Sequence, residues 1–301
     1  MIQQLLLLAI GFIGLWYSAE RTVENSEGLV QKLGMSGFTF GAIFVSVSTG
    51  LPEIFTALVS TMQKVPELSA GDIIGSTLVN MTLILGATAL TAREMELTED
   101  DIHLIKASCA TIFIAAGILY AAGALTAYTS LALTGLYIAF LSLFGDSYFK
   151  MDSHEDGELR YSVLRTGLGL VGLLVFARVT VFSAVNIGEI LGIPVEILGT
   201  TVVAVGTGLP ELAFEITSVK NGDYDLALGD IFGSTVVNIT LVTGLLGAMN
   251  TLVLTHAIPV LAMILAVSAG IFLLSRKKNF SWIDGAVLLG LFILYMLFQL
   301  L

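Results

Sequence analysis

The sequence TGLPE occurs twice, at Thr49–Glu53 and Thr207–Glu211, and a second shared motif follows each copy: GDIIGSTLVN at 71–80 and GDIFGSTVVN at 229–238. A shift of 158 residues aligns the surroundings without a gap. Ten of 21 residues are identical between 33–53 and 191–211, and 11 of 16 between 71–86 and 229–244. Apolar helices share Leu and Val by chance, but they do not share prolines, glutamates and asparagines in register. The chain is therefore an internal duplication.

The composition around these motifs is that of an integral membrane protein. Hydrophobic residues make up 56% of the 301 residues and charged residues only 12%, whereas a soluble domain has roughly 25% charged residues. The net charge of −11 and the absence of a basic stripe exclude a nucleic-acid-binding surface. The apolar runs are continuous rather than alternating, which favours helices over a barrel. Ten spans are predicted, at 2–17, 36–62, 69–91, 102–121, 124–144, 161–186, 193–219, 227–248, 252–274 and 282–301.

The number of spans in each copy predicts how the two copies are oriented. Five is odd, so the second copy enters the membrane from the opposite side, as in secondary transporters. The predicted fold is an all-α integral membrane protein with ten transmembrane helices, built as two inverted-topology five-helix repeats (1–144 and 161–301) joined by a cytoplasmic linker (145–160). With the N-terminus outside, every Lys and Arg except Lys64 and Arg178 falls at the cytoplasmic side or its flanks. Both termini are therefore predicted to lie on the outer side of the cell membrane.

Each repeat places a glutamate, Glu53 or Glu211, deep inside a span. A carboxylate at membrane depth is costly and usually faces a polar pathway. The preceding prolines lack an N–H, so the carbonyls of Ser48 and Gly206 lose their helical partners. Each helix is therefore predicted to break just before its glutamate, leaving carbonyl oxygens free to bind a cation.

The second motif supplies further oxygens along one helix face. Asp72, Ser76 and Asn80 recur at i, i+4 and i+8, and Asp230, Ser234 and Asn238 repeat the spacing. The two asparagines are predicted to contact a cation or the glutamates. The two aspartates either line the pathway or cap their helices, because they fall in the first turn of the predicted spans. Glu215 has no counterpart in the first repeat, and it either lines an inner vestibule or pairs with Arg178.

These groups are all hard oxygen ligands, with no thiol or imidazole among them. The set suits Ca²⁺, which takes about 6–8 oxygens in flexible geometry. Two facing carboxylates in a low-dielectric centre cannot both stay ionised without a cation. The site should therefore hold either one Ca²⁺ or compensating protons or Na⁺, and this mutual exclusion couples an antiporter.

The paired LPE and GS-x₃-N segments resemble the two alpha repeats of the Ca²⁺/cation antiporter superfamily, which includes Na⁺/Ca²⁺ and H⁺/Ca²⁺ exchangers. The resemblance covers both halves and implies ten helices with alternating access around a midplane site. It also implies that Glu53 and Glu211 are the principal calcium ligands. Their implied neighbours are Thr49, Thr207, Ser76, Ser234, Asn80 and Asn238.

Departures from the family pattern bear on the counter-ion. Na⁺/Ca²⁺ exchangers usually carry Thr-Ser-x-Pro-Glu, whose serine helps build Na⁺ sites, but here the serine is replaced by Gly50 and Gly208. Prokaryotic Na⁺/Ca²⁺ exchangers also tend to have Asp at one of the two asparagine positions, and here both are Asn. The motifs equally lack the Gly-Asn-Ala-x-Glu form common in H⁺/Ca²⁺ exchangers. Because protons need only the carboxylates, we expect exchange of Ca²⁺ for H⁺, with Na⁺/Ca²⁺ exchange as the alternative.

Two other function classes are weighed against transport. Tyr224-Asp225 and Gly229-Asp230 resemble the YD and GxGD motifs of intramembrane aspartyl proteases, but Ala227 replaces the first glycine and YD lies in the same segment. A cation channel is compatible with inverted repeats, yet a two-glutamate site favours tight binding over rapid flow. We therefore expect no enzymatic activity, no cofactor and no obligate protein partner. The expected partners are Ca²⁺, H⁺ or Na⁺ and the lipid bilayer.

Overall fold

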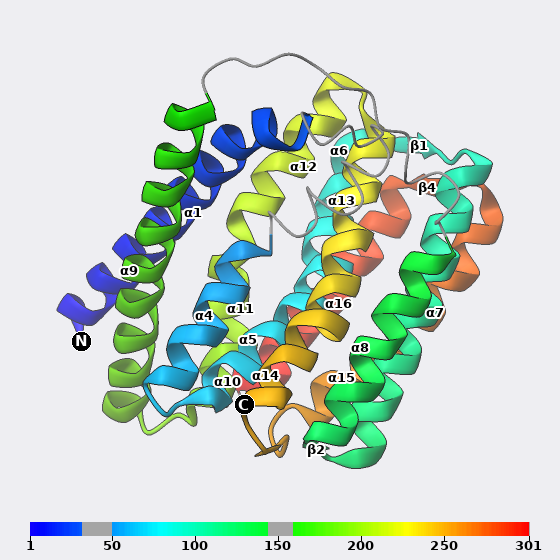
Figure 1. Ribbon diagram of the computed structural model, residues 1–301. Helices are drawn as coiled ribbons and strands as arrows, with labels where there is room; N and C mark the ends of the chain where they lie inside the picture. The colour runs from blue at the N-terminus through cyan, green and yellow to red at the C-terminus, as the bar shows by residue number, and fades with distance from the viewer. Residues whose placement is uncertain (32–49, 144–158, 301) are drawn as a thin grey trace.

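The computed structural model describes residues 1–31, 50–143 and 159–300, and this part of the chain forms a helical bundle (Figure 1). Eight of its helical segments are long and apolar enough to cross a membrane, and two shorter apolar helices cover Leu51–Met62 and Ala127–Ser142. Helices satisfy their backbone hydrogen bonds internally, as the bilayer requires. The predicted all-helical membrane fold is confirmed. The predicted linker lies outside the described residues, except that helix α9 already begins at Leu159.

The first half contains α1 (Ile2–Gln31), α4 (Leu51–Met62), α5 (Pro66–Val79), the π-helical η2 (Asn80–Ile84), α6 (Leu85–Ala92), β1 (Glu94–Glu96), α7 (Glu99–Ala122), β2 (Ala124–Leu125) and α8 (Ala127–Ser142). The second half contains α9 (Leu159–Leu191), α10 (Val195–Leu198), η4 (Gly199–Val203), α11 (Ala204–Thr207), α12 (Leu209–Asn221), α13 (Tyr224–Val236), η5 (Val237–Val242), α14 (Thr243–Met249), β3 (Leu252–Val253), α15 (Ile258–Leu274), η6 (Ser275–Lys277), β4 (Asn279–Ser281) and α16 (Trp282–Leu300).

The spans that carry the GD-x-x-GST motifs occupy the centre of the bundle. In both Pro66–Ala92 and Tyr224–Met249, 83% of the most apolar window is buried, against 22% for Trp282–Gln299 and 29% for Ile2–Thr22. The polar residues of the motifs therefore lie inside the protein, and the outer helices present their apolar side chains to the surroundings. Burial of a polar motif in the most enclosed helices marks it as the place where a ligand would sit.

Helices α1 and α9 pack along each other at one side of the bundle (Figure 1). Glycines allow this close approach, because a Cβ at Gly14 would meet the ring of Phe176, and one at Gly11 would meet Thr180. A small hydrophobic cluster that includes Leu15 and Leu173 joins the pair to α4 and α10 and is separate from the main core. Small residues at such crossings are how membrane helices gain van der Waals contact.

Elements of the two halves correspond at the 158-residue shift. The π-helical segment that begins at Asn80 has its counterpart in the one that contains Asn238. The short strand β1 pairs antiparallel with β4, and β2 pairs with β3, so each pair joins one strand from each half. The two strand pairs lie at opposite ends of the bundle (Figure 1).

Candidate cation site

Each motif glutamate stands near the start of a helix, and in the second repeat another helix ends shortly before it. Helix α4 begins at Leu51 after Gly50, with Pro52 in its first turn. In the second half α11 ends at Thr207, and α12 begins at Leu209, with Gly208 between them. The predicted break is confirmed in the second repeat, whereas Ser48 and Thr49 lie outside the described residues. Each glutamate thus stands in the first turn of a helix, where unpaired N–H groups and the helix dipole favour negative charge.

Glu53 and Glu211 are buried, with 0% and 2% of their surface exposed. None of their four carboxylate oxygens makes a hydrogen bond within the described residues. The two carboxylates are close enough to interact electrostatically, and Asp72 interacts with Glu53 in the same way. Burying such a group without a partner costs several kcal/mol. The arrangement therefore calls for a cation or for protons.

Asp72 of α5 is joined to the second repeat through Thr207. The Thr207 hydroxyl lies 3.1 Å from Asp72 Oδ1, to which it can donate, and Ser76 Oγ lies 3.5 Å from both Asp72 Oδ1 and Thr207 Oγ1. All three residues are buried, and Thr207 also lies beside Glu53. Three oxygens with this spacing resemble one face of a coordination shell whose metal–oxygen distances are about 2.3–2.6 Å.

A second contact between the repeats joins Asn80 to Ser234. The Asn80 amide Nδ2 donates to Ser234 Oγ at 3.2 Å, and this leaves Asn80 Oδ1 buried without a partner among the described residues. Both side chains lie beside Glu211. The amide of Asn238 is fully buried, and neither of its polar atoms has a described partner. Free amide oxygens beside a carboxylate are suitable ligands for a hard cation.

The helix geometry at both asparagines is π-helical rather than α-helical. Segment η2 starts at Asn80, and η5 spans Val237–Val242 around Asn238. The wider turn lets the Thr243 hydroxyl reach the Asn238 carbonyl at 2.8 Å, five residues back. Single-turn π segments inside α-helices occur often at functional sites. The sequence analysis did not predict them.

The aspartates are not helix caps. Helix α5 begins at Pro66 and α13 begins at Tyr224, three residues before the predicted span in each case. Asp72 and Asp230 therefore lie in the second turn, with 0% and 1% of their surface exposed. The helices start earlier because proline is favoured in the first turn of α5, and the turn before α13 ends at Asp223.

Of the two alternatives for Glu215, the pairing with Arg178 is wrong. Arg178 is exposed on α9, whereas Glu215 is completely buried and lies beside Asp230 and Glu211. Neither Glu215 oxygen makes a hydrogen bond to a described residue. This neighbourhood was missed, although a signal was present: Glu215 and Asp230 are equally far from the turn that joins α12 to α13.

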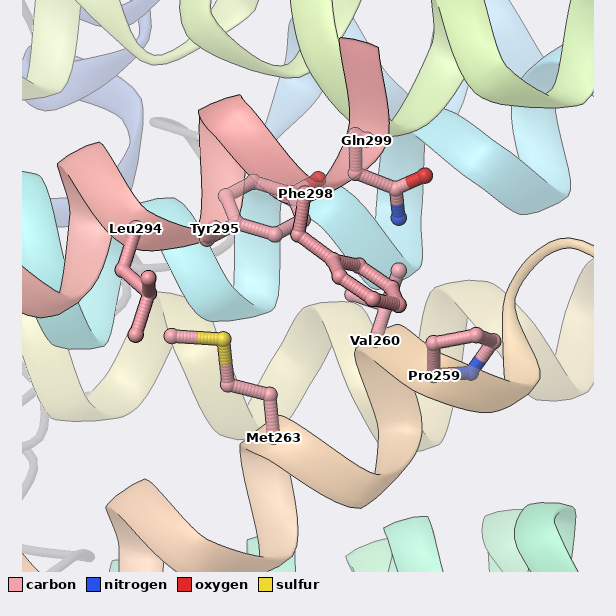
Figure 2. Close-up of a pocket in the computed structure, with 7 residues that line it drawn as sticks. All are labelled: Pro259, Val260, Met263, Leu294, Tyr295, Phe298 and Gln299. Atoms are coloured by element: carbon pink, nitrogen blue, oxygen red, sulfur yellow. The ribbon is translucent and has the colours of Figure 1, made fainter. Parts of the chain in front are cut away.

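Two of the hollows between helices have no carboxylate in their lining. Pro259, Met263, Tyr295 and Phe298 contribute to the wall of one of about 280 Å³ between α15 and α16, shown in Figure 2. The other, of about 390 Å³, lies between α1 and α12, and its lining includes Gly206. Both are almost entirely apolar. Among the described residues, no three His, Cys, Asp or Glu side chains form a ready metal cluster, so a cation must also draw on amide and hydroxyl oxygens.

Comparisons with known proteins agree with this geometry. The family described as "Sodium/calcium exchanger protein" matches residues 3–145 and 161–301. This chain belongs to that family. It is a member of the Ca²⁺/cation antiporter superfamily, as the motifs predicted. A family of exchangers moves ions and is not one of enzymes, which is consistent with the expectation that the chain has no enzymatic activity.

Relatives of known name cover most of the exchanger chain. The inner membrane protein YrbG of Escherichia coli is 30% identical over 253 residues, covering 79% of this chain and 78% of YrbG. The sodium/calcium exchanger MaX1 of Methanosarcina acetivorans is 25% identical, covering 80% and 82% of the two chains. A structure of the sodium-calcium exchanger NCX_Mj soaked with Na⁺ and Sr²⁺ superposes with a TM-score of 0.72 at 24% identity and covers 98% of both chains, so the two share a fold.

Proposed function

We propose that this exchanger is a secondary active antiporter that exchanges Ca²⁺ for H⁺ by alternating access at a site between Glu53 and Glu211. The observation that carries the proposal is the pair of buried glutamates, one from each repeat, whose four oxygens have no described partner. One Ca²⁺ between two carboxylates is neutral, and two protons neutralise the same pair. Either a Ca²⁺ ion or two protons therefore offsets the free-energy cost of burying the two carboxylates, whereas the pair without a cation or protons bears the full cost.

The remaining ligands come from both repeats. Asn80 and Ser234 lie beside Glu211, and Thr207 lies beside Glu53, so each glutamate meets a polar side chain of the other half. Together with Ser76, Asn238, Thr49 and the carbonyls of Ser48 and Gly206, they offer the oxygen-rich shell that Ca²⁺ prefers. Because the shell is shared between halves, a relative movement of the two repeats would disassemble and rebuild it.

We further propose that the ten spans form two inverted repeats, 1–144 and 161–301, with both termini outside. Eight long helices together with the short α4 and α8 supply ten segments. The matched π segments and the strand pairs at opposite ends of the bundle support the inversion (Figure 1). Inverted repeats give two conformations that expose a central site to opposite sides of the membrane.

Protons are the proposed counter-ion because the centre is rich in carboxylates and lacks the serine hydroxyls before Leu-Pro-Glu that help build Na⁺ sites in Na⁺/Ca²⁺ exchangers. Asp72 and Asp230 add two further buried carboxyl groups, and Gly50 and Gly208 offer no side-chain oxygen. Protons that compete for these groups lower the affinity for Ca²⁺ as the pH falls. Sodium is the second candidate, favoured by the name of the relative MaX1 as a sodium/calcium exchanger.

The test is Ca²⁺ flux in proteoliposomes with the membrane potential clamped and either a pH gradient or a Na⁺ gradient imposed alone. We expect the pH gradient to drive saturable Ca²⁺ uptake and the Na⁺ gradient to have little effect. Uptake that follows Na⁺ and ignores pH would replace the proton with Na⁺ and leave the calcium site intact. Uptake at channel-like rates without any counter-gradient would contradict antiport.

A further inference from the structure

The α12–α13 hairpin carries a second pair of neighbouring acidic residues, Glu215 and Asp230. This pair lies about one helical turn along the hairpin from Glu211 of the proposed exchange site. The turn of the hairpin lies at Gly222 and Asp223, and Figure 1 shows the two helices side by side at one end of the bundle. Glu215 and Asp230 each stand seven residues from this turn, and Glu211 and Ser234 each stand eleven. At 1.5 Å per residue, the first pair is about 10 Å below the turn and about 6 Å from the second.

The pair is sealed inside the protein. Glu215 has 0% and Asp230 1% of its surface exposed, and their carboxylates interact electrostatically with each other. Both oxygens of Glu215 lack a hydrogen-bond partner among the described residues. Two adjacent buried carboxylates repel unless a cation or a shared proton lies between them.

The corresponding level of the first repeat has no such pair. The position equivalent to Glu215 is Ala57, and the equivalent of Asp230 is Asp72, whose Oδ1 lies 3.1 Å from the Thr207 hydroxyl. Among the described residues, two carboxylates therefore lie at this depth only near the end of the bundle formed by the α12–α13 turn, which we call the α12–α13 mouth. Because Ala57 replaces Glu215 in the first repeat, the second carboxylate is not part of the duplicated exchange motif.

We propose that Glu215 and Asp230 form a second calcium site, a staging site that Ca²⁺ occupies between the α12–α13 mouth and the exchange site. Two carboxylates balance one divalent cation. Asp225, which lies near Asp100 and Asp101 at the same end, places negative charge at the entrance and raises the local cation concentration. The proposal rests on the proposed function for the direction of travel but not for binding itself.

The two sites are too close for stable double occupancy. Two divalent ions about 6 Å apart would repel strongly in a low-dielectric interior. The staging site therefore fills when the exchange site is empty and passes its ion onward. It gives the α12–α13 mouth a higher apparent affinity for Ca²⁺ than the opposite mouth.

The first test is equilibrium Ca²⁺ binding to purified protein in which Glu53→Gln disables the exchange site. We expect residual saturable binding that disappears when Glu215→Gln is added. Absence of residual binding in Glu53→Gln, or residual binding unchanged by Glu215→Gln, would overturn the staging site. This result does not depend on transport, so it separates failure of the staging site from failure of the proposed function.

The second test compares Ca²⁺ KM at the two faces in right-side-out and inside-out vesicles. Glu215→Gln should raise KM about tenfold at the α12–α13 mouth and leave it unchanged at the other, the size expected when one charged ligand is lost. Asp230→Asn should act at the same face, and the exposed Glu67→Gln is the matched control. An equal change at both faces, or none at either, would contradict the proposal, and size-exclusion profiles identify a variant that fails to fold.

Discussion

The α4–α5 and α12–α13 hairpins carry the same two motifs but surround their aspartates differently. Glu53 and Glu211 occupy equivalent first-turn positions, and both are buried without hydrogen bonds to described residues. One level away, Asp230 lies beside Glu215, whereas the residue equivalent to Glu215 in the α4–α5 hairpin is Ala57. The two repeats have therefore kept equivalent central glutamates, and they differ in the residues nearer the ends of the bundle. A shared exchange site with unequal access routes is the arrangement that this difference indicates.

The largest effect should come from the residues that the two hairpins share. Glu53→Gln and Glu211→Gln should each lower Ca²⁺ exchange at least about 100-fold, because a single carboxylate cannot balance a divalent ion in a buried site. The measurement is Ca²⁺ flux in proteoliposomes reconstituted with equal amounts of folded protein. Glu67→Gln, at an exposed glutamate in the first turn of α5, is the control. If either glutamine variant transports Ca²⁺ like the parent protein, the exchange site is not formed by one glutamate from each hairpin.

Thr207→Val should have the next largest effect, because it removes a hydroxyl of the second repeat that contacts Asp72 of the first. It leaves Asp72 Oδ1 without the hydroxyl 3.1 Å away and removes an oxygen beside Glu53. We expect the apparent affinity for Ca²⁺ to fall about 10- to 100-fold, the cost of an unsatisfied buried charged group.

Thr217→Val is the matched control for this change, since Thr217 lies on the same helix but its exposed hydroxyl bonds only the Ala213 carbonyl among described residues. Both variants remove one hydroxyl from α12. Equal Ca²⁺ KM values for the two variants would show that the Asp72 contact has no part in ion binding.

Alanine substitutions of Asn80 and Asn238 should have smaller effects on Ca²⁺ binding, and their effects on stability should differ. Asn80→Ala removes both a free amide oxygen and the 3.2 Å bond to Ser234, whereas the amide of Asn238 has no described partner to lose. Both changes should weaken Ca²⁺ affinity several-fold, and Asn80→Ala should also lower the thermal unfolding temperature further, by about 2–4 °C. Calcium titration and a thermal melt on the same preparations measure the two effects. Equal melting temperatures would contradict the structural part of this difference.

The smallest effect concerns the position before each proline. Gly50→Ser with Gly208→Ser should increase the inhibition of Ca²⁺ binding by Na⁺ a few-fold at constant pH. The φ of −78° at Gly208 suits serine, but an added Cβ would lie 3.5 Å from Ile84 and only 3.2 Å from the Ala204 carbonyl oxygen, which has to shift slightly. Gly→Ala at both positions controls for the added carbon. Sodium inhibition that is already strong in the parent protein would favour Na⁺ as its natural counter-ion.

Much of the fold was predictable from the sequence because the bilayer restricts the choice. Continuous apolar runs of about 20 residues form helices in a membrane, and the duplicated motifs identified the central spans. The helix break before Glu211 was predictable because proline removes a specific hydrogen bond, and the break predicted before Glu53 lies outside the described residues. These inferences use local chemistry, which a sequence displays directly.

The partners of the aspartates and of Glu215 were harder to predict because they depend on where a helix begins and how it is rotated. A shift of three residues at Pro66 excluded the helix cap, which was one of the two roles left open for Asp72. Glu215 is equally compatible with Arg178 or Asp230 until the rotation of α12 is known. The contact between Thr207 and Asp72 joins residues 135 positions apart, and no local pattern encodes it.

The most direct test of the central claim is self-exchange of calcium, which requires one alternating site but no particular counter-ion. Vesicles loaded with unlabelled Ca²⁺ are exposed to radiolabelled Ca²⁺ in the absence of pH and Na⁺ gradients. The shared site between Glu53 and Glu211 predicts saturable label uptake that internal Ca²⁺ stimulates and that Glu53→Gln abolishes. Uptake that rises linearly with external Ca²⁺, ignores internal Ca²⁺ and persists in Glu53→Gln would contradict it.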